Sequence, residues 1–156
     1  MKREILKGFT IFTLMVALAI LTSVVSANAQ SRIRVSANIP FEFVVGDKTL
    51  PAGEYSLIPA TNGDEALKVQ NDENGNAAVR LTEPTIEMKK RHSRLVFHRY
   101  GQSYFLAEVW NGERTGRQLA KSKQERAIER ELASIPSKSE LAQDLCEIVE
   151  VVAVLR

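Results

Sequence analysis

The stretch LVFHRYGQSYFLAEVW, residues 95–110, decides the fold that this sequence predicts. Apolar and polar side chains alternate along residues 95–100 and again along residues 104–110, the pattern of half-buried β-strands. Gly101 and Gln102 lie between the two runs as a turn. Two alternating runs joined by a short turn that contains glycine indicate a β-hairpin. This is the clearest hairpin in the sequence, and it points to an antiparallel β protein.

The sequence on the N-terminal side of this hairpin keeps the period of two residues. Residues 33–45 alternate and predict a strand in which Pro40 marks an edge, a bulge or a break. The turns that follow are rich in glycine, proline and asparagine, and Asn74-Gly75 is a strong hairpin signal. Between these turns we expect short strands over residues 54–58, 66–70 and 78–82, and a further extended piece over 85–88.

The alternation stops after Asn111-Gly112. Residues 122–133 are rich in helix formers, with Ser122 as N-cap and Glu125 at the capping-box position, and predict one amphipathic helix that ends near Pro136. Residues 147–155 are apolar and β-branched on both faces, which predicts a buried final strand. The fold class is therefore mainly β: an antiparallel β-sandwich or barrel of about eight short strands, with one helix in the C-terminal half.

The first 29 residues have the pattern of a cleavable secretory signal peptide. A basic start precedes a mostly apolar stretch over residues 9–25, and Ala27 and Ala29 form a small-x-small motif before Gln30. A permanent anchor is disfavoured, because a spanning helix needs about 20 predominantly apolar residues and this stretch is shorter. We therefore expect a periplasmic or extracellular protein, soluble and not integral to the membrane after cleavage, with one β-rich domain over residues 30–156.

Cleavage would change the charge of the protein. The chain has 21 Lys and Arg and 19 Asp and Glu, and removing three basic residues and one acidic residue with the signal leaves 18 of each. A near-neutral domain gives no electrostatic case for binding nucleic acid. Cys146 is the only cysteine, so the exported domain has no internal disulfide. We expect Cys146 to be a small semi-buried residue rather than a reactive thiol.

Two groups of motifs carry a resemblance to a known family. The first is IPFEFVVG at residues 39–46 with KTLPAGEY at 48–55, and the second is LVFHRYG at 95–101 with YFLAEVW at 104–110. Together they resemble a group of small, uncharacterised secreted proteins of Acidobacteria and related soil bacteria, over about residues 37–130. The resemblance implies a bacterial origin and a signal-bearing β-rich domain. It implies no activity and no functional residues.

The sequence carries few residues suited to catalysis. His92 and His98 are the only histidines, whereas metal sites use close pairs of ligands with carboxylates or cysteines, so no metal or other cofactor is predicted. Cys146 with His98 is a conceivable nucleophile and base, but no glycine-flanked elbow surrounds the cysteine. Neither a P-loop nor a dinucleotide-binding glycine pattern is present. An enzyme is therefore disfavoured, and a hydrolase with an unrecognised site stays open as an alternative.

Binding is the favoured class of function. The basic run at residues 89–94 would suit a phosphate, an acidic glycan or lipopolysaccharide, with a solvated loop as the simpler interpretation. The aromatic residues form the core in the simpler interpretation, and line a barrel cavity for a small apolar ligand in the alternative. We expect an exported binding or structural module whose partner is an anionic glycan or another cell-envelope protein. The candidate binding residues are Lys89, Lys90, Arg91, Arg94, His98 and Trp110.

Overall fold

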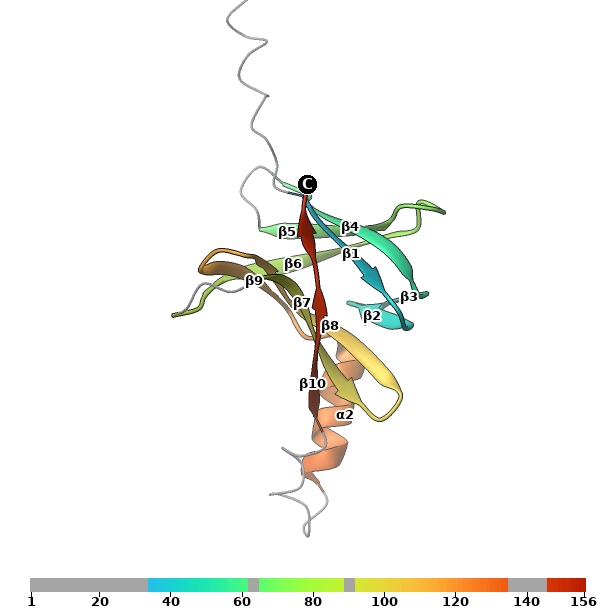
Figure 1. The fold of residues 1–156 in the computed structure, drawn as a ribbon. Helices are drawn as coiled ribbons and strands as arrows, with labels where there is room; N and C mark the ends of the chain where they lie inside the picture. The colour runs from blue at the N-terminus through green and yellow to red at the C-terminus, as the bar shows by residue number, and fades with distance from the viewer. Residues whose placement is uncertain (1–33, 62–64, 89–91, 135–145) are drawn as a thin grey trace, which may run out of the picture. The chain divides into compact units, whose positions relative to one another are not determined.

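The computed structural model describes residues 34–61, 65–88, 92–134 and 146–156. The chain divides into Met1–Arg32 and a compact unit, Ile33–Arg156, which holds all the described residues. The expected cleavage site at Ala27, Ala29 and Gln30 lies outside the described residues, as do Lys89, Lys90 and Arg91. The described part is mainly β, with 11 strands and one helix, which confirms the predicted fold class (Figure 1).

The strands form two sheets that share β6 (Ala77–Ile86). Residues 77–81 of β6 pair with β5, and residues 82–86 pair with β9. The first sheet also holds β1 (Val35–Ile39), β4 (Gly53–Pro59), β5 (Ala66–Asn71) and β11 (Val154–Leu155). The second holds β7 (Ser93–Tyr100), β8 (Ser103–Asn111), β9 (Thr115–Leu119) and β10 (Glu147–Val152), with the hairpin of β2 (Phe43–Val45) and β3 (Lys48–Leu50) beside β8.

Every pairing is antiparallel except that of β2 with β8. The strand order is β10-β7-β8-β9-β6-β5-β4-β1-β11, so the sheet is open and does not close into a barrel. The C-terminal segment supplies both ends of this order, with β10 against β7 and β11 against β1 (Figure 1). Between the two strands, the amide of Ala153 donates to the carbonyl of Ser93 at 2.9 Å.

The core draws its side chains from the facing sides of both sheets. Its largest members are aromatic: the ring of Phe43 meets those of Tyr55 and Phe97 edge-on, with centroids 5.0 and 5.5 Å apart. The hydroxyl of Tyr55 donates to the carbonyl of Pro51 at 2.6 Å, so the one polar atom of that ring is satisfied. The other fully buried apolar side chains are Ile39, Val45, Leu50, Leu57, Val69, Leu95 and Phe105.

The prediction of a buried final strand is wrong. Ile148, Val152 and Val154 are 65%, 76% and 61% exposed, whereas Ala153 is buried and Val149 and Val151 pack partly against the core. One face of β10, with Val149 and Val151, packs against the core, whereas Ile148 and Val152 on the other face stay largely exposed. A sequence that is apolar on both faces does not reveal whether a second layer will cover both of them.

Three further strands depart from the sequence prediction. Strand β3 was not expected, because glycine and proline indicate turns on both sides of it, and it pairs with β2. Strand β9 was not expected either, and it pairs with both β6 and β8. Its Gly116 interrupts the alternation because an added Cβ would lie 2.6 Å from the ring of Trp110. Residues 78–82 and 85–86 belong to the one long strand β6, which continues through Pro84.

The helix α2 (Lys123–Ala133) is the one that the sequence predicts. The Oγ of Ser122 accepts a hydrogen bond from the amide of Glu125 at 2.9 Å, which is the expected N-cap. Glu125 is the one residue of α2 that is buried. Its burial marks the face of α2 that lies against the sheet.

Candidate functional site

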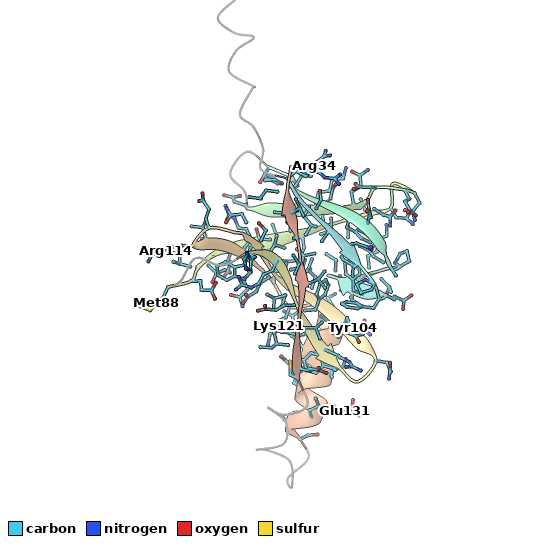
Figure 2. All side chains as sticks on the ribbon, in the orientation of Figure 1. Arg34, Met88, Tyr104, Arg114, Lys121 and Glu131 are labelled. Carbon is cyan, nitrogen blue, oxygen red and sulfur yellow. The ribbon has the colours of Figure 1, made fainter. Side chains whose placement is uncertain are left out.

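A cleft of about 410 Å³ lies between α2 and the outer face of β7 and β10. This volume is in the range of small-molecule sites, about 300–1,000 Å³. We name it the helix–strand cleft. Figure 2 marks Lys121 above the upper end of α2 and Glu131 toward its lower end. The residues that line the cleft are His98, Tyr100, Lys121, Glu129, Leu132, Cys146 and Ile148.

A histidine and a glutamate connect the helix to the sheet beside this cleft. The Nδ1 of His98, on β7, lies 2.8 Å from Oε1 of Glu125, on the first turn of α2. The carboxylate is buried and the imidazole is half-buried. A carboxylate opposite Nδ1 favours the tautomer that carries its proton there, which leaves Nε2 as an acceptor in the neutral ring. The pair therefore fixes both the orientation and the hydrogen-bonding character of His98.

Three side chains form a second polar group in the cleft. The hydroxyl of Tyr100 donates to Oε1 of Glu129 at 2.8 Å, and the ammonium of Lys121 donates to the same oxygen. Burial raises the pKa of Glu129, but the hydrogen bonds from Lys121 and Tyr100 outweigh it and the net pKa is lowered. The hydrogen bond to Glu129 raises the pKa of Lys121. At neutral pH this arrangement holds a paired ammonium and carboxylate at the cleft wall.

Burial also raises the pKa of Tyr100 above its usual value of 10.0, and its neighbours Cys146 and Glu129 raise it further. The phenol is therefore neutral at physiological pH and acts as a hydrogen-bond donor. Cys146, which the sequence predicts to be semi-buried, has an intermediate exposure and lines the cleft with His98. The cleft thus brings together a thiol, an oriented imidazole, a neutral phenol and an ion pair.

Arg80 positions the segment that carries Lys121. From β6, its guanidinium donates to the carbonyl of Ala120 at 3.0 Å and to that of Lys121 at 2.9 Å. Gly46, in the turn between β2 and β3, leaves room for this side chain, because an added Cβ would lie 3.2 Å from Cδ of Arg80. The backbone of Gly46 also has a φ of 64°, which favours glycine. Strand β6 and the turn at Gly46, both remote in sequence, therefore position the segment that leads into α2.

Of the nominated binding residues that the structure describes, Arg94, His98 and Trp110, only His98 lies in the helix–strand cleft. Arg94 and Trp110 face each other across β7 and β8, with the guanidinium 4.9 Å from the ring centroid. Arg94 is buried and paired with Glu87 at 2.9 Å and with Glu150 at 3.3 Å. The indole nitrogen of Trp110 donates to Glu108 at 2.8 Å. Arg94 therefore belongs to strand β7 and not to a solvated basic loop, and its charge is balanced by carboxylates of the same protein.

Sequence reasoning did not nominate Tyr100, Lys121, Glu125 or Glu129 as site residues. Glu125 and Glu129 are four residues apart in the predicted helix, which places their side chains on one face, whereas Lys121 precedes the N-cap. That spacing was a signal that could have identified the two glutamates. The spacing does not show which surface of the sheet this helix face meets. The cleft exists only because the helix meets that surface.

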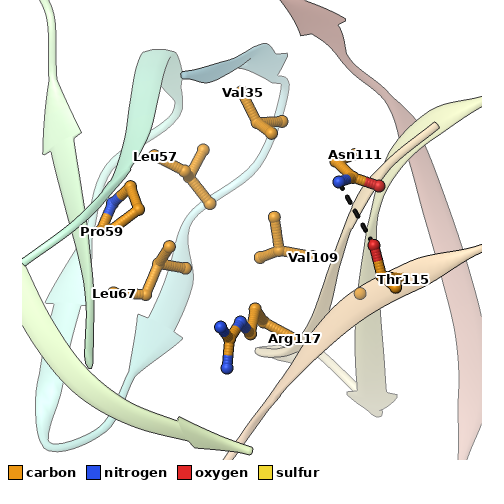
Figure 3. A pocket seen from close by; sticks show the side chains of 9 residues that line it. Val35, Leu57, Pro59, Leu67, Val109, Asn111, Thr115 and Arg117 are labelled. Atoms are coloured by element: carbon orange, nitrogen blue, oxygen red, sulfur yellow. Dashed lines mark hydrogen bonds between the residues drawn. The ribbon is translucent and has the colours of Figure 1, made fainter. Parts of the chain in front are cut away.

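A second, smaller pocket opens between the two sheets. Val35, Leu57 and Leu67 line one side and Val109 the other, and at its mouth Asn111 donates to Thr115 at 3.5 Å (Figure 3). Its volume is about 120 Å³, well below that of a typical ligand site. The interior is otherwise occupied by core side chains. This pocket is small for the alternative in which the protein carries a small apolar ligand between its sheets.

The fold and the cleft define a mainly β protein with an open sheet and a helix packed across one end of β7. Comparisons with protein-family models, curated proteins and solved structures give no match. Across the described ranges, no three His, Cys, Asp or Glu side chains are grouped so that they could hold a metal ion. Among the same residues, no helix has the length and apolar character needed to cross a membrane.

Proposed function

We propose that this chain is an exported binding module that holds a small ligand in the helix–strand cleft. The observation that carries the proposal is the convergence of polar and titratable side chains from β7, α2 and the C-terminal segment on one cleft of about 410 Å³. Export rests on the N-terminal pattern of residues 1–29 and agrees with the resemblance to secreted bacterial proteins. N-terminal sequencing of exported material should give a start at Gln30, and a start at Met1 would refute cleavage.

The chemistry of the cleft favours a ligand with both polar and apolar parts. Leu132 and Ile148 provide aliphatic walls on opposite sides, from α2 and β10. Nε2 of His98 is left as an acceptor, and the ammonium of Lys121 has three N–H groups, of which Glu129 uses one. Because Lys121 and Glu129 balance each other, the cleft has no strong preference for a charged ligand.

Native mass spectrometry of the exported protein tests this proposal. The wild type should carry a non-covalent small-molecule adduct, and Ile148→Trp should lose it because the indole fills the cleft. Ile86→Trp is the matched control, since it makes the same change at an exposed position of β6. An adduct that survives in Ile148→Trp, or the absence of any adduct in the wild type, would contradict the proposal.

A hydrolase is the second candidate, because the cleft holds Cys146 together with His98, whose Nδ1 is fixed by Glu125. In such a mechanism the base takes the thiol proton and the sulfur attacks an acyl carbon. The leaving group departs with that proton, water then hydrolyses the thioester, and a carboxylate orients the base throughout. The test is the rate at which iodoacetamide alkylates Cys146 at neutral pH. A slower rate in His98→Gln than in the wild type supports the hydrolase. An equal rate in the two proteins contradicts the hydrolase and leaves the binding module as the proposed function.

A further inference from the structure

A third pocket, of about 280 Å³, lies where β1 and β4 meet the end of the C-terminal segment. We name it the strand-edge pocket. Ser36 and Asn38 of β1, Glu54 of β4, and Asp72 after β5 provide its polar lining. Val152 and Val154 provide an apolar wall, and Arg156 is at the rim. None of these residues belongs to the helix–strand cleft, so this pocket is independent of the function proposed above.

Ser36 is the residue that points to a ligand. It is 8% exposed, and its hydroxyl oxygen is buried without a hydrogen-bond partner in the described structure. A buried hydroxyl that makes no hydrogen bond is costly, so most are paired. The neighbouring Ser56, its partner in the register of β1 and β4, is paired, because its hydroxyl donates to Asp72 at 2.9 Å. Ser36 also lines the pocket, so a ligand bound there would lie next to the residue whose hydroxyl lacks a partner.

We propose that the strand-edge pocket binds a neutral sugar unit. Sugar hydroxyls both donate and accept, so neighbouring hydroxyls suit the carboxylates of Glu54 and Asp72 together with the hydroxyl of Ser36. The C–H face of the ring would lie against Val152 and Val154. The carboxylates disfavour an anionic ligand by repulsion, and Arg156 disfavours a polyamine. This ligand differs from the anionic glycan predicted from residues 89–94.

The test is a titration of the ¹⁵N-labelled protein, residues 30–156, with cellobiose, followed by two-dimensional NMR. Amide shifts should be confined to the strand-edge pocket, and Ser36→Ala should weaken binding by about fivefold, as for one lost hydrogen bond. Ser103→Ala is the control, since it removes a hydroxyl at the start of β8, outside the pocket. Glucuronate and 1,4-diaminobutane are run in parallel as the anionic and cationic probes.

Three results would overturn the proposal: no shifts with cellobiose, equal affinity in Ser36→Ala, or tighter binding of either charged probe. The melting temperature of the free protein adds a separate readout. Ser36→Ala should melt higher than the wild type without sugar, because it removes an unsatisfied hydroxyl. If Ser36→Ala melts lower than the wild type and the wild type does not bind cellobiose, the hydroxyl of Ser36 is paired with an ordered water and not with a sugar. Ile148→Trp should still bind cellobiose, so this result and that for the helix–strand cleft are distinguishable.

Discussion

The carboxylate of Glu125 lies 2.8 Å from Nδ1 of His98, and the amide of the same glutamate donates to the N-cap hydroxyl of Ser122. One residue therefore both begins the helix and attaches it to β7. The side chain of Glu125 is nine-tenths or more buried, and a buried carboxylate without a partner is costly. The imidazole of His98 provides that partner. This relationship makes α2 part of the sheet structure rather than an appended helix.

Replacing His98 should destabilise the protein more than replacing Glu125 by its amide. His98→Ala leaves a buried carboxylate without its partner, and we expect a loss of about 2 kcal/mol in the free energy of unfolding. Glu125→Gln keeps an oxygen that can accept from Nδ1 and should lose less. Urea denaturation at pH 7 measures both, and the double variant gives the coupling. Additive effects of the two changes would contradict a direct interaction.

Removing the N-cap should weaken α2 specifically. Ser122→Ala eliminates the acceptor for the amide of Glu125, and we expect a loss of about 1 kcal/mol. Ser122→Thr keeps a hydroxyl at the cap and should stay near the wild type. Urea denaturation followed by circular dichroism compares the three proteins. If Ser122→Thr were as unstable as Ser122→Ala, the hydroxyl would not be the cause.

Glu129 should contribute to stability at neutral pH and lose that contribution in acid. Its pKa in the folded protein is lowered from the ordinary value of 4.5, because hydrogen bonds from Lys121 and Tyr100 outweigh the effect of burial. The folded state therefore binds protons less readily than the unfolded chain, and stability falls as the pH drops below about 4.5. Urea midpoints for Glu129→Gln should be below those of the wild type at pH 7, and the difference should shrink at pH 3. The matched control is Glu131→Gln at an exposed position of α2, and an equal acid response in both variants would contradict this prediction.

Gly116 should not tolerate a side chain. In Gly116→Ala the new Cβ would lie 2.6 Å from the ring of Trp110, and we expect a loss of about 2 kcal/mol from overpacking. Trp110 is the only tryptophan, so its fluorescence reports the displacement of the ring directly. Gly75→Ala is the comparison, because its Cβ would meet open space and any loss there comes from its φ of 72° rather than from a contact. An unchanged emission spectrum in Gly116→Ala would show that the close approach is absent in solution.

Arg94 should matter for stability rather than for binding anions. Arg94→Met leaves Glu87 and Glu150 without this partner and removes the guanidinium from the face of Trp110. Because the two carboxylates are partly exposed, we expect a loss of about 1 kcal/mol in the free energy of unfolding. The triple variant Lys89→Ser, Lys90→Ser, Arg91→Ser tests the predicted anion binding separately, by retention on heparin at increasing salt. If Arg94→Met abolished retention on heparin and the triple variant did not, Arg94 would be the anion-binding residue and this prediction would be wrong.

Local pattern predicted most of the fold. The alternation of residues 95–110 gave the hairpin of β7 and β8, and the capping residues gave the start of α2 within one residue. These features depend on interactions between residues close in sequence, which is why they can be predicted. Strand β9 was missed for a tertiary reason, since Gly116 is required by a ring that comes from the neighbouring strand.

By itself, the sequence determined the class of fold and the helix, because period and capping are properties of a single segment. The tertiary structure alone decided that β10 is an edge strand, that Arg94 is paired, and that His98 meets Glu125. Each of these depends on which surfaces meet after long-range strand pairing. The candidate site belongs to this second group, because its residues come from β7, α2 and the C-terminal segment, and only packing brings them together.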